Sequence, residues 1–300
     1  TDIHKDITSP DYRLLKRDLV KASLTVLKNE RQLIPLRKLD TLRIASVSFG
    51  SEKETVFQRT LSLYAGVKHF ALPANAGTIQ IDSVRKALKD FNLVIGSIHD
   101  NSIRPLNRLD LSAEVLNLMT ELTRDKTFVL AAFKNPYVLS KITGVEQSDA
   151  LIVAYQDDPD TESITAQLVF GGIDAHGRLP VTVGHIFKAG DGLDVEGGIR
   201  FEYTMPEDAG MDSETLIGGV DSLVTQALDS KAIPGCQVLV ARDKKIVLHK
   251  AYGLHSYSDT VKVKLSDLYD LASVTKISTS MAALMKLYDE GKFRLDATVG

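Results

Sequence analysis

Residues 42–98 read LRIASVSFGSEKETVFQRTLSLYAGVKHFALPANAGTIQIDSVRKALKDFNLVIGSI, and this stretch decides the fold. It contains three short apolar runs, each with the length of a buried strand, at 42–49, 67–72 and 91–98. The two segments between these runs, near 53–64 and 78–89, are typical of amphipathic helices. Strands that alternate with helices form parallel sheets whose two faces are both covered. The stretch therefore predicts an α/β fold.

The alternation continues along the chain. Two more buried strands are predicted at 127–133 and 150–155. Further helices are predicted near 112–123, 136–142 and 159–170. Together with the opening stretch, these elements predict a flavodoxin-like α/β sandwich with a mostly parallel sheet.

A helix is expected to precede the sheet. Ser9 suits the N-cap position and Pro10 the first helical position. From there to about Asn29, apolar residues recur at helical spacing, at Leu15, Leu19, Ala22 and Val26. Asp158-Pro159 repeats the same signal. We therefore interpret Asp158 as a helix cap, although Asp157, Asp158 and Asp160 resemble paired catalytic carboxylates.

Length and composition exclude several classes of protein. A chain of 300 residues is typical of two domains. Its 44% hydrophobic and 25% charged residues exclude a disordered or collagen-like chain. The net charge is -3 without a basic stripe, so we expect no nucleic-acid partner. No apolar run reaches the roughly 18 residues of a membrane span. The single cysteine, Cys236, excludes an internal disulfide.

The composition changes near residue 185. Five glycines crowd into a stretch with few apolar residues, at Gly184, Gly190, Gly192, Gly197 and Gly198. This pattern predicts three parts: the sandwich at 1–185, a linker at 186–206 and a second segment at 207–300.

The second segment is predicted to be α+β. A helix follows Met211, with an apolar face formed by Leu216, Val220, Leu223, Val224 and Ala227. Two strands at 236–241 and 246–252 form an antiparallel hairpin across Asp243-Lys244. A last helix runs from about Ser273 to Glu290 and ends at Gly291.

This second segment is expected to be incomplete. One hairpin and two helices leave a sheet edge and helix faces without a covering layer. Either further chain or another subunit would cover them. Because the sequence starts at Thr1 without a methionine, we favour a piece of a longer protein.

Ser273-Val274-Thr275-Lys276 is the main candidate for chemistry. Residues three apart on a helix share one face, so an amine or ammonium lies beside a hydroxyl. A neutral lysine can take the serine proton, whereas a charged lysine stabilises the alkoxide. At the start of a helix, unpaired backbone N–H groups can also bind an oxyanion. We therefore predict that Ser273 and Lys276 are catalytic.

The motif also has a purely structural explanation, an N-cap serine followed by a surface lysine. About one Ser-x-x-Lys is expected by chance in a chain of this length. Ser83-Val84-Arg85-Lys86 is a second copy. We interpret this copy as part of a solvated helix face.

The residues around Ser273 resemble the start of class C β-lactamases and related penicillin-recognising serine hydrolases, including esterases and D,D-peptidases. The matching stretches occur in the same order, at 233–240, 248–253, 271–276 and 290–296. The resemblance implies that Ser273 is the acyl-forming nucleophile, Lys276 its activating partner and the Ser273 N–H half of the oxyanion hole. The family also needs downstream Tyr-x-Asn and Lys-Thr-Gly motifs, which do not follow Ser273 here. These residues alone are therefore expected not to turn over substrate.

The first segment resembles the C-terminal α/β sandwich of glycoside hydrolase family 3. Residues 18–30 with Leu33-Ile34-Pro35-Leu36 match the entry to that domain, and 170–172 with 177–183 match its closing motif. The resemblance implies that the nucleophilic carboxylate lies on an upstream TIM-barrel domain, which is missing here.

The absence of a glutamate indicates which branch of this family the sequence resembles. In the β-glucosidase branch the sandwich lends a general-acid Glu, but the matching residues 99–111 contain none. The β-N-acetylhexosaminidase branch, whose acid is a His on the barrel, fits better, and the sandwich is then a scaffold. His99 and Asp100 follow a strand end, where open sheets place ligand loops. We interpret them as a solvated loop rather than a catalytic pair.

No motif for a metal or a cofactor is present. The seven histidines include no His-x-x-x-His or His-Glu-x-x-His pair, and no Gly-x-Gly-x-x-Gly or P-loop occurs. We therefore expect neither group.

Together the resemblances imply a multidomain bacterial hydrolase that joins a glycosidase sandwich to a serine acyl-transfer module. Peptidoglycan-derived muropeptides are the expected substrates, because hexosaminidases cut cell-wall sugars and penicillin-recognising enzymes act on D-alanyl peptides or their mimics. This implies a periplasmic or cell-envelope location. Two alternatives stay open: a β-N-acetylhexosaminidase with a vestigial serine-hydrolase module, and a non-catalytic scaffold.

Overall fold

The computed structural model describes residues 9–99, 109–296 and 298. The chain separates into two compact units. The first contains Thr1–Val220 and Leu239–Leu248, and the second contains Asp221–Val238 and His249–Gly300. The α/β sandwich lies in the first unit, and both residues of the predicted catalytic pair lie in the second.

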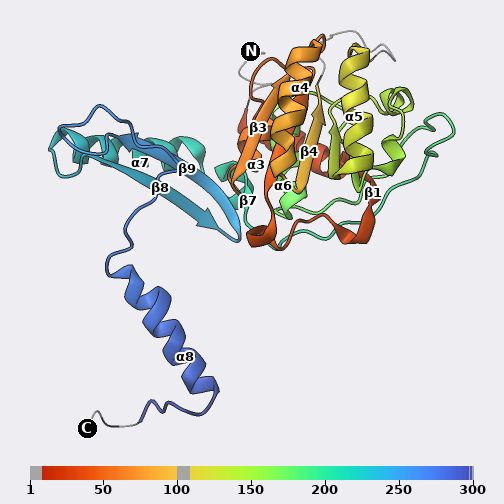
Figure 1. Cartoon of the computed structure of the whole chain (residues 1–300). Coiled ribbons are helices and arrows are strands. Elements are labelled where there is room, and N and C mark those ends of the chain that lie inside the picture. Colours follow the sequence, from red (N-terminus) through yellow and green to blue (C-terminus); the bar gives the residue numbers. More distant parts are fainter. Residues whose placement is uncertain (1–8, 100–108, 297, 299–300) are drawn as a thin grey trace. The chain divides into compact units, whose positions relative to one another are not determined.

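A six-stranded sheet forms the centre of the first unit (Figure 1). The order across the sheet is β1-β6-β5-β4-β2-β3. The strands are β1 Thr25–Asn29, β2 Ile44–Phe49, β3 Val67–Leu72, β4 Leu93–Ile98, β5 Thr127–Ala132 and β6 Ala150–Val153. β1 is antiparallel to β6, and the other pairs are parallel. Counted from β2, the parallel strands follow the flavodoxin-like order 2-1-3-4-5. The predicted fold class is confirmed.

Helices cover both faces of this sheet. α4 (Thr78–Ala87) and α5 (Ala113–Asp125) pack on one face. α2 (Pro10–Ser23), α3 (Val56–Leu61) and α6 (Pro159–Phe170) pack on the other. Every residue of β2 and β4 is buried, because these strands have neighbours on both sides and helices on both faces. The apolar runs in the sequence reflect this double burial.

The carboxyl ends of the central strands lie in register. Phe49 of β2 pairs with Ile98 of β4, which pairs with Ala132 of β5. The residues that follow, Gly50 and His99, therefore emerge side by side at one edge of the sheet, where the His99 N–H donates to the Phe49 carbonyl at 2.8 Å. The strand order reverses between β2 and β4, and open α/β sheets bind ligands at such a position.

Gly96 in β4 makes room for two buried aromatic rings. A Cβ at this position would lie 2.6 Å from Cζ of Phe128 and 3.1 Å from Cε2 of Phe49. We expect Gly96→Ala to destabilise the protein by about 1–3 kcal/mol, because fully buried rings cannot move aside freely. Urea unfolding measures this loss. Gly66→Ala is the matched control, since a Cβ there meets no atom within 4 Å. An equal loss in both variants would contradict the explanation.

The first helix is shorter than predicted. α2 ends at Ser23, Leu24 is its C-cap, and Thr25–Asn29 form β1. β-Branched Thr25 and Val26 favour a strand, and pairing with β6 outweighs the helical spacing of the apolar residues. The stretch predicted as a helix near 136–142 is a short 3₁₀ helix, Pro136–Lys141.

The buried face of α2 also differs from the prediction. Leu15 and Leu19 are exposed, whereas Arg17 is buried. The Arg17 guanidinium donates to the carboxylate of Asp160 at 3.0 Å and to the Tyr203 carbonyl at 3.1 Å. Polar contacts therefore set the rotation of this helix, and apolar periodicity alone does not reveal them.

After the sandwich the chain forms a small sheet and two helices. β7 (Glu202–Tyr203) pairs with β9 (Lys245–Gly253), which forms the predicted hairpin with β8 (Gly235–Arg242). Asp243 and Lys244 at its turn have φ of 50° and 64°, as a type I′ turn requires. α7 (Ser213–Asp229) precedes the hairpin, with Leu223 exposed rather than on its apolar face.

The last helical segment ends as predicted. A π-helical turn, Lys276–Met281, leads into α8 (Ala282–Asp289). Gly291 then has a φ of 69°, and the Lys292 N–H donates to the Leu287 carbonyl at 2.8 Å. In the described part of the chain, no helix combines the length and apolar character needed to cross a bilayer.

Candidate active site

Ser273 and Lys276 lie in direct contact. The Lys276 Nζ donates to the Ser273 Oγ at 3.0 Å. Ser273 lies at the start of the helical segment, where its carbonyl accepts from the Lys276 N–H at 3.0 Å. The spacing of three residues thus brings the two side chains together, as the sequence suggests. Their catalytic role stays a prediction.

The residue before Ser273 has an unusual backbone. Ala272 has a φ of 42°, in the left-handed region that residues with a Cβ rarely adopt. Its N–H donates to the Asp270 carboxylate at 3.0 Å, and its carbonyl accepts from the Thr275 N–H at 3.1 Å. Such strained positions cluster at active sites, where they hold a side chain in place. Ala272 therefore favours a functional role for the serine beside it.

The loop that leads to Ser273 is anchored to the hairpin. The Gln237 side chain donates to the carbonyls of Lys264 at 2.6 Å and Asp267 at 3.1 Å. The Asp267 carboxylate accepts from the Lys264 N–H and lies 2.7 Å from Nε2 of His255. The bond from Lys264 and then the one with His255 lower the pKa of Asp267. These contacts hold residues 264–267 of the loop against β8.

The helical segment exposes an apolar face. Ile277 is 66% exposed and Met285 is 63% exposed. Met281, Met285, Tyr288 and Phe293 line a hollow of about 420 Å³ beside the helix. The family resemblance implies a buried central helix, whereas the described residues leave this one uncovered. Apolar faces of this kind are normally covered in a folded protein.

The second Ser-x-x-Lys motif lies on a solvated surface. Ser83 and Lys86 on α4 are both exposed, while Ile81 and Val84 face the core. The interpretation of this copy as a solvated helix face is confirmed.

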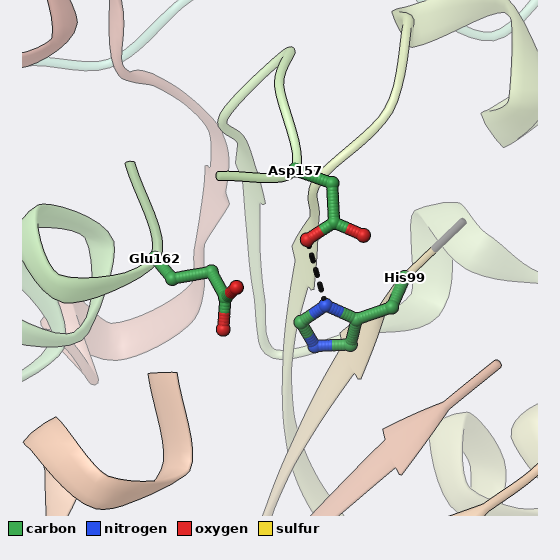
Figure 2. A group of neighbouring side chains, drawn as sticks. All are labelled: His99, Asp157 and Glu162. Carbon is green, nitrogen blue, oxygen red and sulfur yellow. Dashed lines mark hydrogen bonds and ion pairs between the residues drawn. The ribbon is translucent and has the colours of Figure 1, made fainter. Parts of the chain in front are cut away.

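His99 does not lie in a solvated loop, and this interpretation was wrong. The residue is 6% exposed, and its ring stacks on Phe133 with centroids 5.0 Å apart. Figure 2 shows the Asp157 carboxylate turned toward the ring, with Oδ1 3.0 Å from Nδ1. The other ring nitrogen, Nε2, lies 2.9 Å from Oγ of Ser97. The central position of β4 explains this burial, and Asp100 lies outside the described residues.

Asp158 caps α6, as predicted. Its Oδ1 accepts from the N–H groups of Asp160 at 3.1 Å and Thr161 at 3.4 Å. Burial raises the pKa of Asp158, but the bonds from Lys16 and Thr161 outweigh burial and lower it. Asp158 is therefore a structural residue, whereas its neighbour Asp157 faces His99.

Sequence patterns did not reveal Glu162 and Ser97. The Glu162 carboxylate is buried near His99 and accepts from the Phe57 N–H at 2.9 Å. Burial raises its pKa. Asp157, His99 and Ser97 are connected in the same order as the side chains of a serine-hydrolase triad. Ser97 is fully buried, however, so its hydroxyl is not accessible to a substrate. Ser97 lies two residues before His99, but Asp157 lies 58 residues after it, so no local spacing indicates the group as a whole.

Comparison with known proteins decides the class of the second part of the chain. Residues 220–300 match the family model described as Beta-lactamase. This segment is β-lactamase-like. A protein of Escherichia coli O157:H7 named "Putative D-alanyl-D-alanine carboxypeptidase" is 38% identical over 98 residues. The match covers 30% of this chain and 22% of that protein. Protein flp of Staphylococcus aureus is 32% identical and matches 27% of this chain and 16% of its own length.

Solved structures provide a second set of matches, which cover about 60% of this chain. A family 3 β-N-acetylglucosaminidase from Paenibacillus covers 60% of this chain and 34% of its own, with 16% identity and a TM-score of 0.47. A β-glucosidase from Listeria innocua covers 60% of this chain and 28% of its own, with 19% identity and a TM-score of 0.48. Both families that the sequence resembles therefore occur among these proteins. The chain spans about a fifth of the length of the curated relatives it matches.

Proposed function

We propose that these 300 residues act within a larger multidomain hydrolase. The β-lactamase-like segment contributes the nucleophile Ser273 and its partner Lys276, and the sandwich accompanies a family 3 glycosidase domain. The contact of 3.0 Å between Lys276 Nζ and Ser273 Oγ carries the proposal, because it lies within the part that matches the Beta-lactamase family. The proposed boundaries are a sandwich at 1–185, a linker at 186–206 and a serine-hydrolase segment from 207.

The proposed reaction is acyl transfer. Ser273 Oγ attacks the carbonyl carbon of the substrate, and its proton leaves to Lys276 Nζ when that amine is neutral. The oxyanion that forms is stabilised by the backbone N–H of Ser273 at the start of the helix, as one half of the oxyanion hole. Collapse of this intermediate breaks the bond to the leaving amine, which takes up the proton held by Lys276. The product is an acyl-enzyme, which water then hydrolyses to release the acid and restore the Ser273 hydroxyl. The complete reaction also uses the Tyr-x-Asn and Lys-Thr-Gly motifs of the family, which do not occur between Val274 and Gly300.

The proposed substrates are peptidoglycan-derived muropeptides. One similar protein carries the name of a D-alanyl-D-alanine carboxypeptidase, and another the name of a family 3 β-N-acetylglucosaminidase. Muropeptides contain both the N-acetylated sugars and the D-alanyl peptides that such enzymes cut. The absence of Glu from residues 99–111 supports the β-N-acetylhexosaminidase branch. The proposed location is the periplasm or cell envelope, where these substrates occur.

A covalent label tests the serine site. The longest natural polypeptide that contains these residues is incubated with a fluorescent penicillin, digested and analysed by mass spectrometry. We expect one acylated peptide, with the label on Ser273, because among the described residues of the family match only this serine has a hydrogen bond with a lysine amine. The peptide with Ser83 is the internal control. An unlabelled protein, or label on Ser83, would contradict the proposal and favour a non-catalytic role for the segment.

A further inference from the structure

A second group of ionisable side chains lies at the carboxyl edge of the six-stranded sheet. His99 follows β4, Asp157 lies between β6 and α6, and Glu162 lies in α6. One ligand atom from each residue lies within 4.8 Å of the other two. In Figure 2 both carboxylates turn toward the imidazole ring. Three elements of the fold therefore bring one nitrogen and two oxygen ligands around a single small space.

The three side chains are sheltered from water. The side chains of His99 and Asp157 are 5% and 16% exposed, and Glu162 as a residue is 8% exposed. Two carboxylates at close quarters with little solvent repel each other, and a cation between them removes the repulsion. A divalent ion between them balances both carboxylate charges.

The imidazole is oriented as in metal sites. Nε2 lies 2.9 Å from Oγ of Ser97, which can accept its proton. Nδ1 then directs its lone pair toward Asp157. Histidine ligands of metals usually donate their second N–H to an oxygen in this way. The ring is also held by stacking on Phe133, and Glu162 by the N–H of Phe57.

We propose that His99, Asp157 and Glu162 bind a divalent transition-metal ion of the Zn²⁺ type. The ligands are Nδ1 of His99 and one oxygen from each carboxylate. A mixed imidazole and carboxylate set suits Zn²⁺ better than Mg²⁺ or Ca²⁺, which prefer oxygen ligands alone.

The proposed site borders a hollow at the sheet edge. His99 also lines a space of about 170 Å³, together with Gly50, Leu109, Asp110 and Lys134. Three protein ligands leave one coordination position of Zn²⁺ for water or a small ligand. The position next to the reversal of strand order is where open α/β sheets bind ligands. The metal would therefore bind a small ligand in addition to stabilising the fold.

Zn²⁺ titration of the chain tests this site. The untagged 300-residue chain is stripped with a chelator and titrated with ZnCl₂ in a calorimeter, where we expect one Zn²⁺ bound per chain. Glu162→Gln and Asp157→Asn keep the size of each side chain and an oxygen acceptor. We expect each to weaken binding by at least about tenfold, and Ser97→Ala by about tenfold through loss of its bond to Nε2.

His176→Asn is the matched control. Nε2 of His176 lies 3.1 Å from Asp174 and its Nδ1 lies 3.2 Å from Asp194, but the group is exposed. This variant is expected to bind Zn²⁺ like the parent, and circular dichroism in chelator checks that every variant folds. No saturable binding by the parent would overturn the proposal. Unchanged affinity in folded Glu162→Gln, or loss of the site in His176→Asn, would also overturn it.

Discussion

Replacing Ser273 by alanine is expected to slow acylation by a fluorescent penicillin by a factor on the order of 10⁶, the effect typical of removing the nucleophile of a serine hydrolase. Alanine lacks the Oγ that accepts the bond from Lys276, so no oxygen is left to attack the carbonyl. The rate of label incorporation into the longest natural polypeptide that contains these residues measures the effect.

Two controls make this result specific to the serine. Ser83→Ala changes the exposed second copy of the motif and is expected to leave the acylation rate as it is. Thermal unfolding of Ser273→Ala is expected to match the parent, because the side chain is exposed and its removal creates no cavity. Acylation of Ser273→Ala at the parent rate would place the nucleophile elsewhere.

Replacing Lys276 by alanine is expected to slow acylation by about 10²–10⁴-fold, the usual contribution of a positioned acid or base. Its Nζ is 3.0 Å from Ser273 Oγ, within the range that proton transfer needs. The same variant loses any stabilisation of the alkoxide by the ammonium. The measurement is again the rate of label incorporation.

Lys276→Arg separates the two roles of the lysine. Arginine keeps the positive charge but stays protonated, so it cannot take the serine proton. A rate as low as that of Lys276→Ala would identify the lysine as the base. A rate close to the parent would identify charge stabilisation instead. If Lys276→Ala itself acylates at the parent rate, the lysine has neither role.

The central parallel strands could be predicted from sequence because they are buried on both faces. The run from Ile44 to Phe49 is continuous in small or apolar residues, since helices cover the sheet on either side. β1 could not be predicted in this way. Val26 falls in phase with the preceding helix, and only the contact with β6, more than a hundred residues later, makes Thr25 and Val26 part of a strand.

The two candidate sites differ in the same way: one depends on a local contact, and the other on contacts between residues far apart in sequence. Ser273 and Lys276 are neighbours in sequence and meet within one helical turn, so a pattern three residues apart indicates their contact. His99 and Glu162 meet because β4 and α6 are brought together by the sheet. Because His99 and Glu162 are far apart in sequence, no short motif indicates that they meet. The burial of His99 likewise depends on the central place of β4, which strand order determines.

The antiparallel strand β1 has a practical consequence for expression of the sandwich. It occupies the outer side of β6, whose four residues are all buried. A shortened protein that began after Asn29 would expose that row of unpaired amides and carbonyls, which is a template for intermolecular aggregation. Recombinant versions of this domain should therefore begin before Pro10, so that both α2 and the strand it introduces are retained.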